Sequence, residues 1–230
     1  MKSVSIKKHW VQDTEKMFDQ ALLEYPQNDY TYIYIGHSVG GHLLGFLDGK
    51  YQKLISRGFF VGVNIPYWKY LGEFGGRFWI YHSCIASSLY GYYPSSHLGL
   101  GLNLPKGVGA QWGYWSRFEN YMSHNPKTRA KFYECKVPIE AIGFSDDTIA
   151  KEIALKQCTK VLYPQSYRRF IFMDKDDLGL SGKEIGHFKF FKIQSLWEKF
   201  NDWVLRGKRT NLPGRCYTYE PTTYKGISKL

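Results

Sequence analysis

The 230-residue chain is 43% hydrophobic, 18% aromatic and 22% charged, a composition typical of a soluble globular domain with a sizeable core. Its 7 Trp, 19 Tyr and 15 Phe residues exclude a disordered chain. Apolar runs are too short for a membrane span, which we therefore do not expect. The net charge of +11 is concentrated at the two ends of the chain, 1–10 and 206–230. Because the middle is nearly balanced and carries no nucleic-acid motif, we expect no nucleic-acid partner.

The four cysteines and seven histidines form none of the spacings that hold a metal. No CxxC pair, HExxH motif or secretory leader is present, so we expect reduced thiols, a cytoplasmic protein and no metal. Neither a Walker loop nor a GxGxxG segment after a strand occurs. We therefore expect no cofactor.

The first third of the chain alternates helix and strand patterns. Apolar spacing over 14–25 predicts an amphipathic helix, with Asp13 as its N-cap. Six β-branched or aromatic residues over 30–35 predict a strand buried on both faces of a parallel sheet. An apolar helix over 42–47 and a second strand over 54–63 follow.

From 66 to 134 the pattern changes to aromatic and glycine-rich stretches, with short helices expected near 78–89 and 109–121. We interpret this part as a mostly helical cap inserted into the core. Its tryptophans suit an apolar acyl or aromatic substrate, or they simply form the cap's own core. They are Trp68, Trp79, Trp112 and Trp115.

The α/β alternation resumes after the cap. The patterns predict strands over 137–144 and 167–173 and helices over 149–158 and 190–205. The expected fold class is therefore α/β, a mostly parallel sheet with helices on both faces. Its core comprises 10–65 and 135–205, the cap 66–134, and a basic irregular tail 206–230.

The segment Gly36-His37-Ser38-Val39-Gly40 is a GxSxG motif between a predicted strand and a predicted helix. That context is the one a nucleophile elbow requires, because the serine must project from a tight, strained turn. The residues two before and two after the serine come so close that a Cβ on either is expected to clash, so both should be glycine. Gly36 and Gly40 meet that need. The alternative is an ordinary glycine-rich turn between strand and helix.

An acid and a base follow the elbow in the order Ser, Asp, His, which is the hydrolase order. We predict that His187 is the general base for Ser38 and that Asp147 orients the imidazole. Val39 N–H is the predicted oxyanion donor. Asp146 remains the alternative acid, and Asp147 or His187 taken alone also fits a helix cap or an ordinary loop histidine.

These residues resemble the α/β-hydrolase superfamily, and more closely a bacterial family of predicted α/β hydrolases with largely unassigned substrates. The resemblance covers roughly residues 10–195 and implies a serine hydrolase acting on an ester, thioester or amide, with Ser38, Asp147 and His187 as its triad. The stretches that carry it are Ile35–Gly41, Leu98–Gly101, Leu104–Val108, Gln111-Trp112 with Trp115, Phe144–Asp147, Asp177–Leu180 and Ile185–Phe188.

The sequence departs from that family at its amino end. Four strands normally precede the strand before the elbow, and a loop among them supplies a second oxyanion donor. Residues 1–31 here hold one predicted helix and no strong strand, so the chain looks like an amino-terminally shortened member. Loss of one donor costs about 2.7–4 kcal/mol of transition-state stabilisation, and we expect impaired catalysis. The strand over 30–35 becomes an exposed edge, open to self-association or to a separate amino-terminal fragment.

The sequence thus predicts a serine hydrolase. The alternative is a non-catalytic hydrolase-fold remnant or binding module that keeps an aromatic pocket without the oxyanion machinery. A third reading is attachment to anionic lipid or nucleic acid through the basic ends, 1–10 and 206–230.

Overall fold

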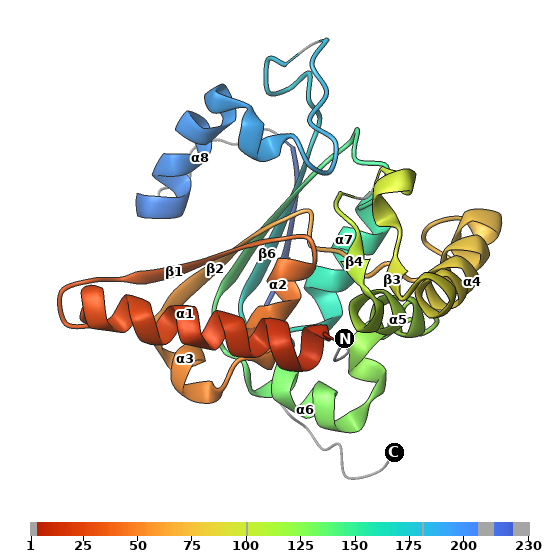
Figure 1. Cartoon of the computed structure of the whole chain (residues 1–230). Helices are drawn as coiled ribbons and strands as arrows, with labels where there is room; N and C mark the ends of the chain where they lie inside the picture. Colours follow the sequence, from red (N-terminus) through yellow and green to blue (C-terminus); the bar gives the residue numbers. More distant parts are fainter. Residues whose placement is uncertain (1–3, 100, 181, 207–213, 223–230) are drawn as a thin grey trace.

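A computed structural model of the chain describes residues 4–99, 101–180, 182–206 and 214–222. Its centre is a five-stranded sheet in the order β1-β2-β5-β6-β7 (Figure 1). The first four strands of that order are parallel, and β7 pairs antiparallel with β6. The strands are β1 (Tyr32–His37), β2 (Ile55–Val61), β5 (Ile139–Phe144), β6 (Arg168–Met173) and β7 (Arg215–Tyr219). A separate antiparallel pair joins β3 (Tyr92–Tyr93) and β4 (Leu104–Pro105).

Helices cover both faces of this sheet. The α-helices are α1 (Val11–Glu24), α2 (Val39–Leu43), α3 (Gly49–Leu54), α4 (Glu73–Tyr90), α5 (Lys106–Trp115), α6 (Pro126–Glu134), α7 (Glu152–Val161) and α8 (Gln194–Arg206). A π-helical turn, η1 (Ile6–Trp10), precedes α1, and the 3-10 turns are η2 (Leu44–Phe46), η3 (Ser95–Leu98), η4 (Tyr121–His124) and η5 (Phe190–Lys192). Among the described residues, no helix is both long and apolar enough to cross a lipid bilayer.

Successive side chains of β2 point to opposite faces of the sheet and so enter two different cores. The Phe60 ring packs against Tyr163, in a cluster to which α1, α3, α6 and α7 contribute. The Phe59 ring packs against Phe200 and Trp203 of α8, which covers the other face. Burial on both faces is what parallel strands require, and it suits the apolar second half of β2, Phe59-Phe60-Val61.

The strands predicted over 54–63, 137–144 and 167–173 are confirmed as β2, β5 and β6. The helix predicted over 14–25 is confirmed as α1, but it begins at Val11 because η1 runs directly into it, so the prediction of an N-cap at Asp13 is wrong. Two further helices, α3 and α6, escaped prediction. Both have an N-cap signal, since Asp48 accepts a bond from Lys50 N and Asn125 precedes Pro126 at the first turn.

Burial of β1 on both faces was wrongly predicted. Its side chains are mostly half-buried, and Ile35 is 52% exposed. Within the described part of the chain β1 pairs only with β2, so it is an edge strand (Figure 1). The described residues that precede it form η1 and α1 and include no strand. An apolar strand sequence reports β-propensity, whereas burial depends on which elements pack beside the strand.

The carboxyl-terminal stretch was predicted to be irregular, and this is wrong for its described part. Residues 215–219 form β7, whose backbone pairs with β6 from Arg168 to Phe172. The Arg168 guanidinium also donates to the carbonyl oxygen of Glu220. Alternating Cys216, Tyr217, Thr218 and Tyr219 suit a strand, a signal that the basic composition of the region obscured. Residues 207–213 and 223–230 lie outside the described residues.

Candidate active site

Ser38 occupies the turn between β1 and α2. Its backbone angles are φ 51° and ψ −125°, and φ is positive at only one other non-glycine residue among those described, Tyr121. Such a conformation costs about 1–3 kcal/mol and persists only when the surroundings enforce it. Here the Ser38 N–H donates to the carbonyl of Val61 at 3.0 Å, which extends the β1–β2 ladder up to the turn. The serine therefore projects beyond the carboxyl ends of the parallel strands.

Close backbone packing explains two of the glycines around this turn. A Cβ on Gly36 would lie 2.6 Å from the Cα of Gly41, and a Cβ on Gly41 would lie 2.4 Å from a methyl of Val63. At Gly40, in contrast, the space within 4 Å is empty. The expectation that a Cβ at Gly40 would clash is thus corrected: the crowded position after the serine is Gly41, because α2 turns that residue toward β2.

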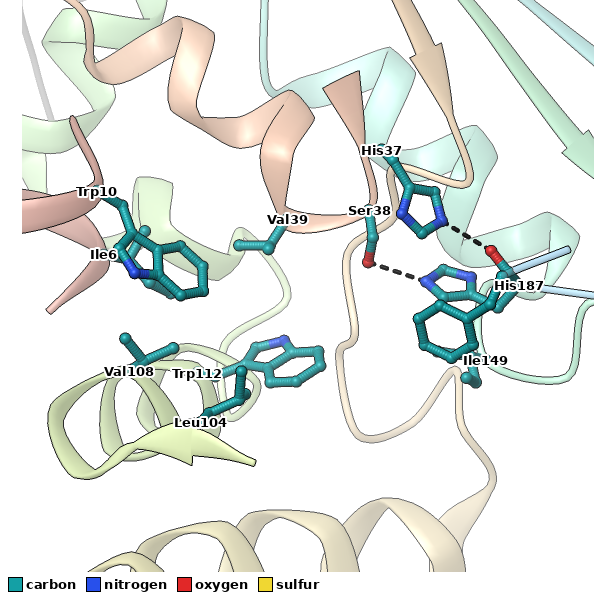
Figure 2. Close-up of a pocket in the computed structure, with 11 residues that line it drawn as sticks. Ile6, Trp10, His37, Ser38, Val39, Leu104, Val108, Trp112, Ile149 and His187 are labelled. Carbon is teal, nitrogen blue, oxygen red and sulfur yellow. Dashed lines mark hydrogen bonds between the residues drawn. The ribbon is translucent and has the colours of Figure 1, made fainter. Parts of the chain in front are cut away.

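Three side chains form one hydrogen-bonded chain beside the turn, and Figure 2 shows its Ser38–His187 bond. The His187 Nε2 lies 2.9 Å from the Ser38 Oγ, and its Nδ1 lies 2.7 Å from the Asp147 Oδ2. The histidine and the aspartate are 7% and 5% exposed. The other oxygen of Asp147, Oδ1, accepts the N–H groups of Ile149 and Ala150. Both carboxylate oxygens are thus bonded, which holds the side chain in one orientation.

Asp146 has a different place. Its two oxygens accept the N–H groups of Ile185 at 2.8 Å and Gly186 at 3.1 Å. These are the two residues before His187, so Asp146 anchors the segment that carries the histidine. Of the two acids that the sequence left open, Asp147 is the one against the imidazole.

Two further residues of the site were missed in the sequence. The His37 Nε2–H donates to the carbonyl oxygen of His187 at 2.7 Å, and the two rings lie 5.0 Å apart. Burial is the main cause that lowers the pKa of His37, while the bond to the His187 carbonyl opposes that shift. Gly62 follows β2 with φ 62°, and a Cβ there would lie 3.3 Å from the His187 Cε1. Its position directly after a buried strand was the available signal.

A cavity of about 160 Å³ opens beside the Ser38 hydroxyl. Its lining is mostly apolar and comes from η1, the turn that carries Ser38, the β4–α5 segment, Ile149 and the loop that carries His187 (Figure 2). The lining residues are Ile6, Trp10, His37, Ser38, Val39, Leu104, Val108, Trp112, Ile149, His187 and Phe188. Of the four tryptophans within 66–134, Trp112 thus faces the cavity, whereas Trp115 is 6% exposed and belongs to the core.

The contribution of η1 to this cavity could not be foreseen. Ile6 is fully buried, and its N–H donates to the Gln111 Oε1 of α5 at 2.9 Å. That bond connects η1 to α5 beside the cavity. Residues 1–10 carry three lysines and no acid, and this composition gave no indication of a binding role.

Val39 is the first residue of α2. The first N–H groups of a helix have no partner inside the helix, so this N–H is available to an oxygen atom near the Ser38 hydroxyl. Among the described residues, no group of three or more His, Cys, Asp or Glu side chains is arranged to hold a metal ion.

No protein-family model matches this chain, and no curated protein matches its sequence. Solved structures do resemble it. One is a soluble variant of monoglyceride lipase from Saccharomyces cerevisiae in complex with a substrate analogue, with 18% identity, a TM-score of 0.53, and coverage of 87% of this chain and 70% of that chain. Another is a monoacylglycerol lipase from Paleococcus ferrophilus, with 9% identity, a TM-score of 0.51, and coverage of 86% and 76%. At these identities the likeness concerns the fold alone.

Proposed function

This chain has the α/β-hydrolase fold, and on that premise we propose that it is a serine hydrolase that cleaves an ester, thioester or amide. The observation that carries the proposal is the continuous chain of hydrogen bonds from Ser38 through His187 to Asp147. A serine becomes a nucleophile when a base lies within hydrogen-bond reach and a third group orients that base. The proposed triad meets both conditions.

In the acylation step, His187 Nε2 accepts the Ser38 hydroxyl proton while Oγ attacks the carbonyl carbon of the substrate. The carbonyl oxygen becomes an oxyanion, to which Val39 N–H donates. The Asp147 carboxylate accepts the His187 Nδ1–H and stabilises the imidazolium. The imidazolium then returns the proton to the leaving alcohol, thiol or amine as its bond to the acyl carbon breaks, and the acyl group remains on Ser38.

In the deacylation step, water takes the place of the leaving group. His187 accepts a proton from the water as it attacks the acyl carbon, and returns that proton to Ser38 as the ester bond to Oγ breaks. The products are a carboxylic acid and the free serine. We assign a single oxyanion donor, Val39 N–H, so we expect turnover slower by about 10² to 10³ than with two donors.

The cavity beside Ser38 indicates which acyl groups fit. Its volume is about 160 Å³ and most of its lining is apolar. An apolar cavity of about 150 Å³ holds a benzene molecule. We therefore propose that the acyl group is short and apolar, butanoyl to hexanoyl or benzoyl in size, with its chain between Trp112 and Val108.

A fluorophosphonate probe tests this function because it labels only an activated serine. The full chain is compared with Ser38→Ala and His187→Ala, and with Ser56→Ala as a control, since Ser56 bonds only the Tyr32 carbonyl far from the site. We expect labelling of the wild type and the control and none of the two site variants. A folded wild-type chain that resists labelling contradicts the proposal and supports the alternative, a non-catalytic binding module with an apolar pocket.

A further inference from the structure

Helix α4 is amphipathic in the reverse of the usual sense, because its small residues are buried and its large ones face outward. Ser83 and Ser87 are fully buried and Ala86 is 4% exposed. These residues pack against the glycines of α5: a Cβ on Gly113 would lie 1.9 Å from the Ser83 Oγ, and one on Gly109 would lie 2.6 Å from the Ser87 Oγ. The two helices thus approach closely through small side chains, the mode of packing found where the outside of a bundle is apolar.

The outer side of α4 carries a continuous row of large apolar side chains, which we call the α4 stripe. Its spacing of three or four residues places all of them on one side of the helix. The members and their exposed fractions are Phe74 88%, Phe78 51%, Tyr81 67%, Ile85 55% and Leu89 75%. Single exposed apolar residues need no explanation, but a row of five along one helix marks an interaction surface.

The charges around the stripe are unevenly distributed. Residues 78–105 contain no Asp, Glu, Lys or Arg, so the face from mid-α4 through β4 has no formal charge. At the amino end of the stripe lies a cavity of about 460 Å³ whose lining includes Arg77, Arg117, Tyr81 and Trp68. The exposed Lys69 ammonium and the Arg77 guanidinium both lie over the Trp68 ring. An uncharged apolar row is thus bordered at one end by three cationic side chains.

We propose that the α4 stripe is the surface by which this protein binds an anionic lipid bilayer. The apolar side chains would enter the boundary between headgroups and acyl chains, while Lys69, Arg77 and Arg117 would contact lipid phosphates. Charge argues for this occupant: Lys69, Arg77 and Arg117 border one end of an apolar row that contains no acid, which matches the phosphates and acyl chains of an anionic bilayer. The proposal is independent of the proposed catalysis.

Vesicle co-sedimentation provides the test. We expect the wild type to bind vesicles of phosphatidylglycerol and phosphatidylcholine, and to bind phosphatidylcholine alone at least tenfold more weakly. The triple variant Phe74→Ser, Ile85→Ser, Leu89→Ser should lose at least tenfold in binding to the anionic vesicles. The control variant Met17→Ser, Leu23→Ser removes two apolar side chains that are 71% and 78% exposed on α1, and should bind like the wild type. Arg77→Gln with Arg117→Gln should reduce the salt dependence of binding.

A second readout follows the stripe itself. Leu89→Cys in a Cys84→Ser, Cys216→Ser background, chosen because Cys216 is an exposed thiol and Cys84 a partly exposed one, is labelled with a nitrobenzoxadiazole dye. Its emission should shift to the blue on addition of the anionic vesicles. Absence of vesicle binding by the wild type overturns the proposal. The proposal is also overturned if the folded triple variant binds the anionic vesicles as tightly as the wild type does. That result would assign attachment to the basic ends, 1–10 and 206–230. If the wild type forms a dimer as its concentration rises and the triple variant does not, the stripe is a self-association surface instead.

Discussion

Asp146 and Asp147, adjacent in the chain, hold the same histidine-bearing segment at two different points. The carboxylate of Asp147 binds the imidazole of His187, whereas that of Asp146 binds the backbone N–H groups of Ile185 and Gly186. One acid therefore acts on the proposed base directly, and its neighbour positions the loop that carries it. This division of roles predicts that the two acids respond differently to the same substitution.

Asp147→Asn should lower the rate of fluorophosphonate labelling by about 10⁴, because an amide stabilises the wrong tautomer of the imidazole. Asp146→Asn should lower it far less, about tenfold, because the loop loses charge-assisted bonds but the imidazole keeps its acid. Stopped-flow labelling rates of the two purified variants check this. Equal losses would contradict the roles assigned here.

Gly62→Ala should slow labelling about tenfold and lower the free energy of unfolding by about 1–2 kcal/mol. The backbone at Gly62 has φ 62°, which costs an alanine about that much, and the new Cβ would press on His187. Gly49→Ala is the matched control, because its Cβ meets empty space. Urea unfolding and labelling rates measure both effects. If Gly62→Ala is labelled as fast as the control, the new Cβ does not displace His187.

Leu104→Ala should shift the preferred acyl chain toward longer esters, because Leu104 lines the cavity beside Ser38. The measurement is kcat/KM for a series of p-nitrophenyl esters from acetate to decanoate. Leu102→Ala serves as the control, since Leu102 is 87% exposed and does not line that cavity. An unchanged profile in Leu104→Ala would show that the acyl group binds elsewhere.

His42 should make the protein less stable as the pH falls. Burial lowers the pKa of His42 from 6.5 to about 4, and its neighbours Cys158 and Tyr121 are also buried, with raised pKa values. Above pH 6.5 the imidazole is neutral in both states and contributes no pH dependence. Between pH 6.5 and 4 the unfolded chain binds the proton and the folded one does not, so up to about 3 kcal/mol of stability is lost.

The measurement for His42 is the free energy of urea unfolding at several pH values between 7.5 and 4, for the wild type and His42→Gln. Carboxylates contribute equally to both proteins, so the difference between their slopes isolates the histidine. Parallel slopes would mean that His42 takes up its proton as readily in the folded state as in the unfolded one, and would contradict the prediction.

Ile35→Lys should reduce self-association without affecting labelling of Ser38. Ile35 is 52% exposed on β1, which pairs only with β2 among the described strands. A lysine on an edge strand opposes pairing with another chain. Ile153→Lys is the control, because Ile153 is equally exposed, at 50%, but lies on α7. Light scattering at rising concentration compares the three proteins, and similar scattering by all of them would count against edge pairing.

The sequence alone predicted the α/β alternation, because most of β5 and the second halves of β2 and β6 are apolar and buried on both faces. It also predicted the elbow around Ser38 and the order of Ser38, Asp147 and His187, because local turn chemistry and chain order are properties of the sequence itself. It placed Asp147 and Asp146 together but left open which of them meets the histidine.

Only the tertiary structure decided that question, since one residue's difference along a turn points two carboxylates in different directions. It also decided that β1 lies at the edge of the sheet, that Gly41 rather than Gly40 is the crowded glycine, and that Ile6 completes the cavity. Each of these depends on contacts between segments far apart in the chain. Such contacts leave no local period or motif in the sequence. Many sequences form the same helices and strands, and the detailed packing between these elements decides which residues meet.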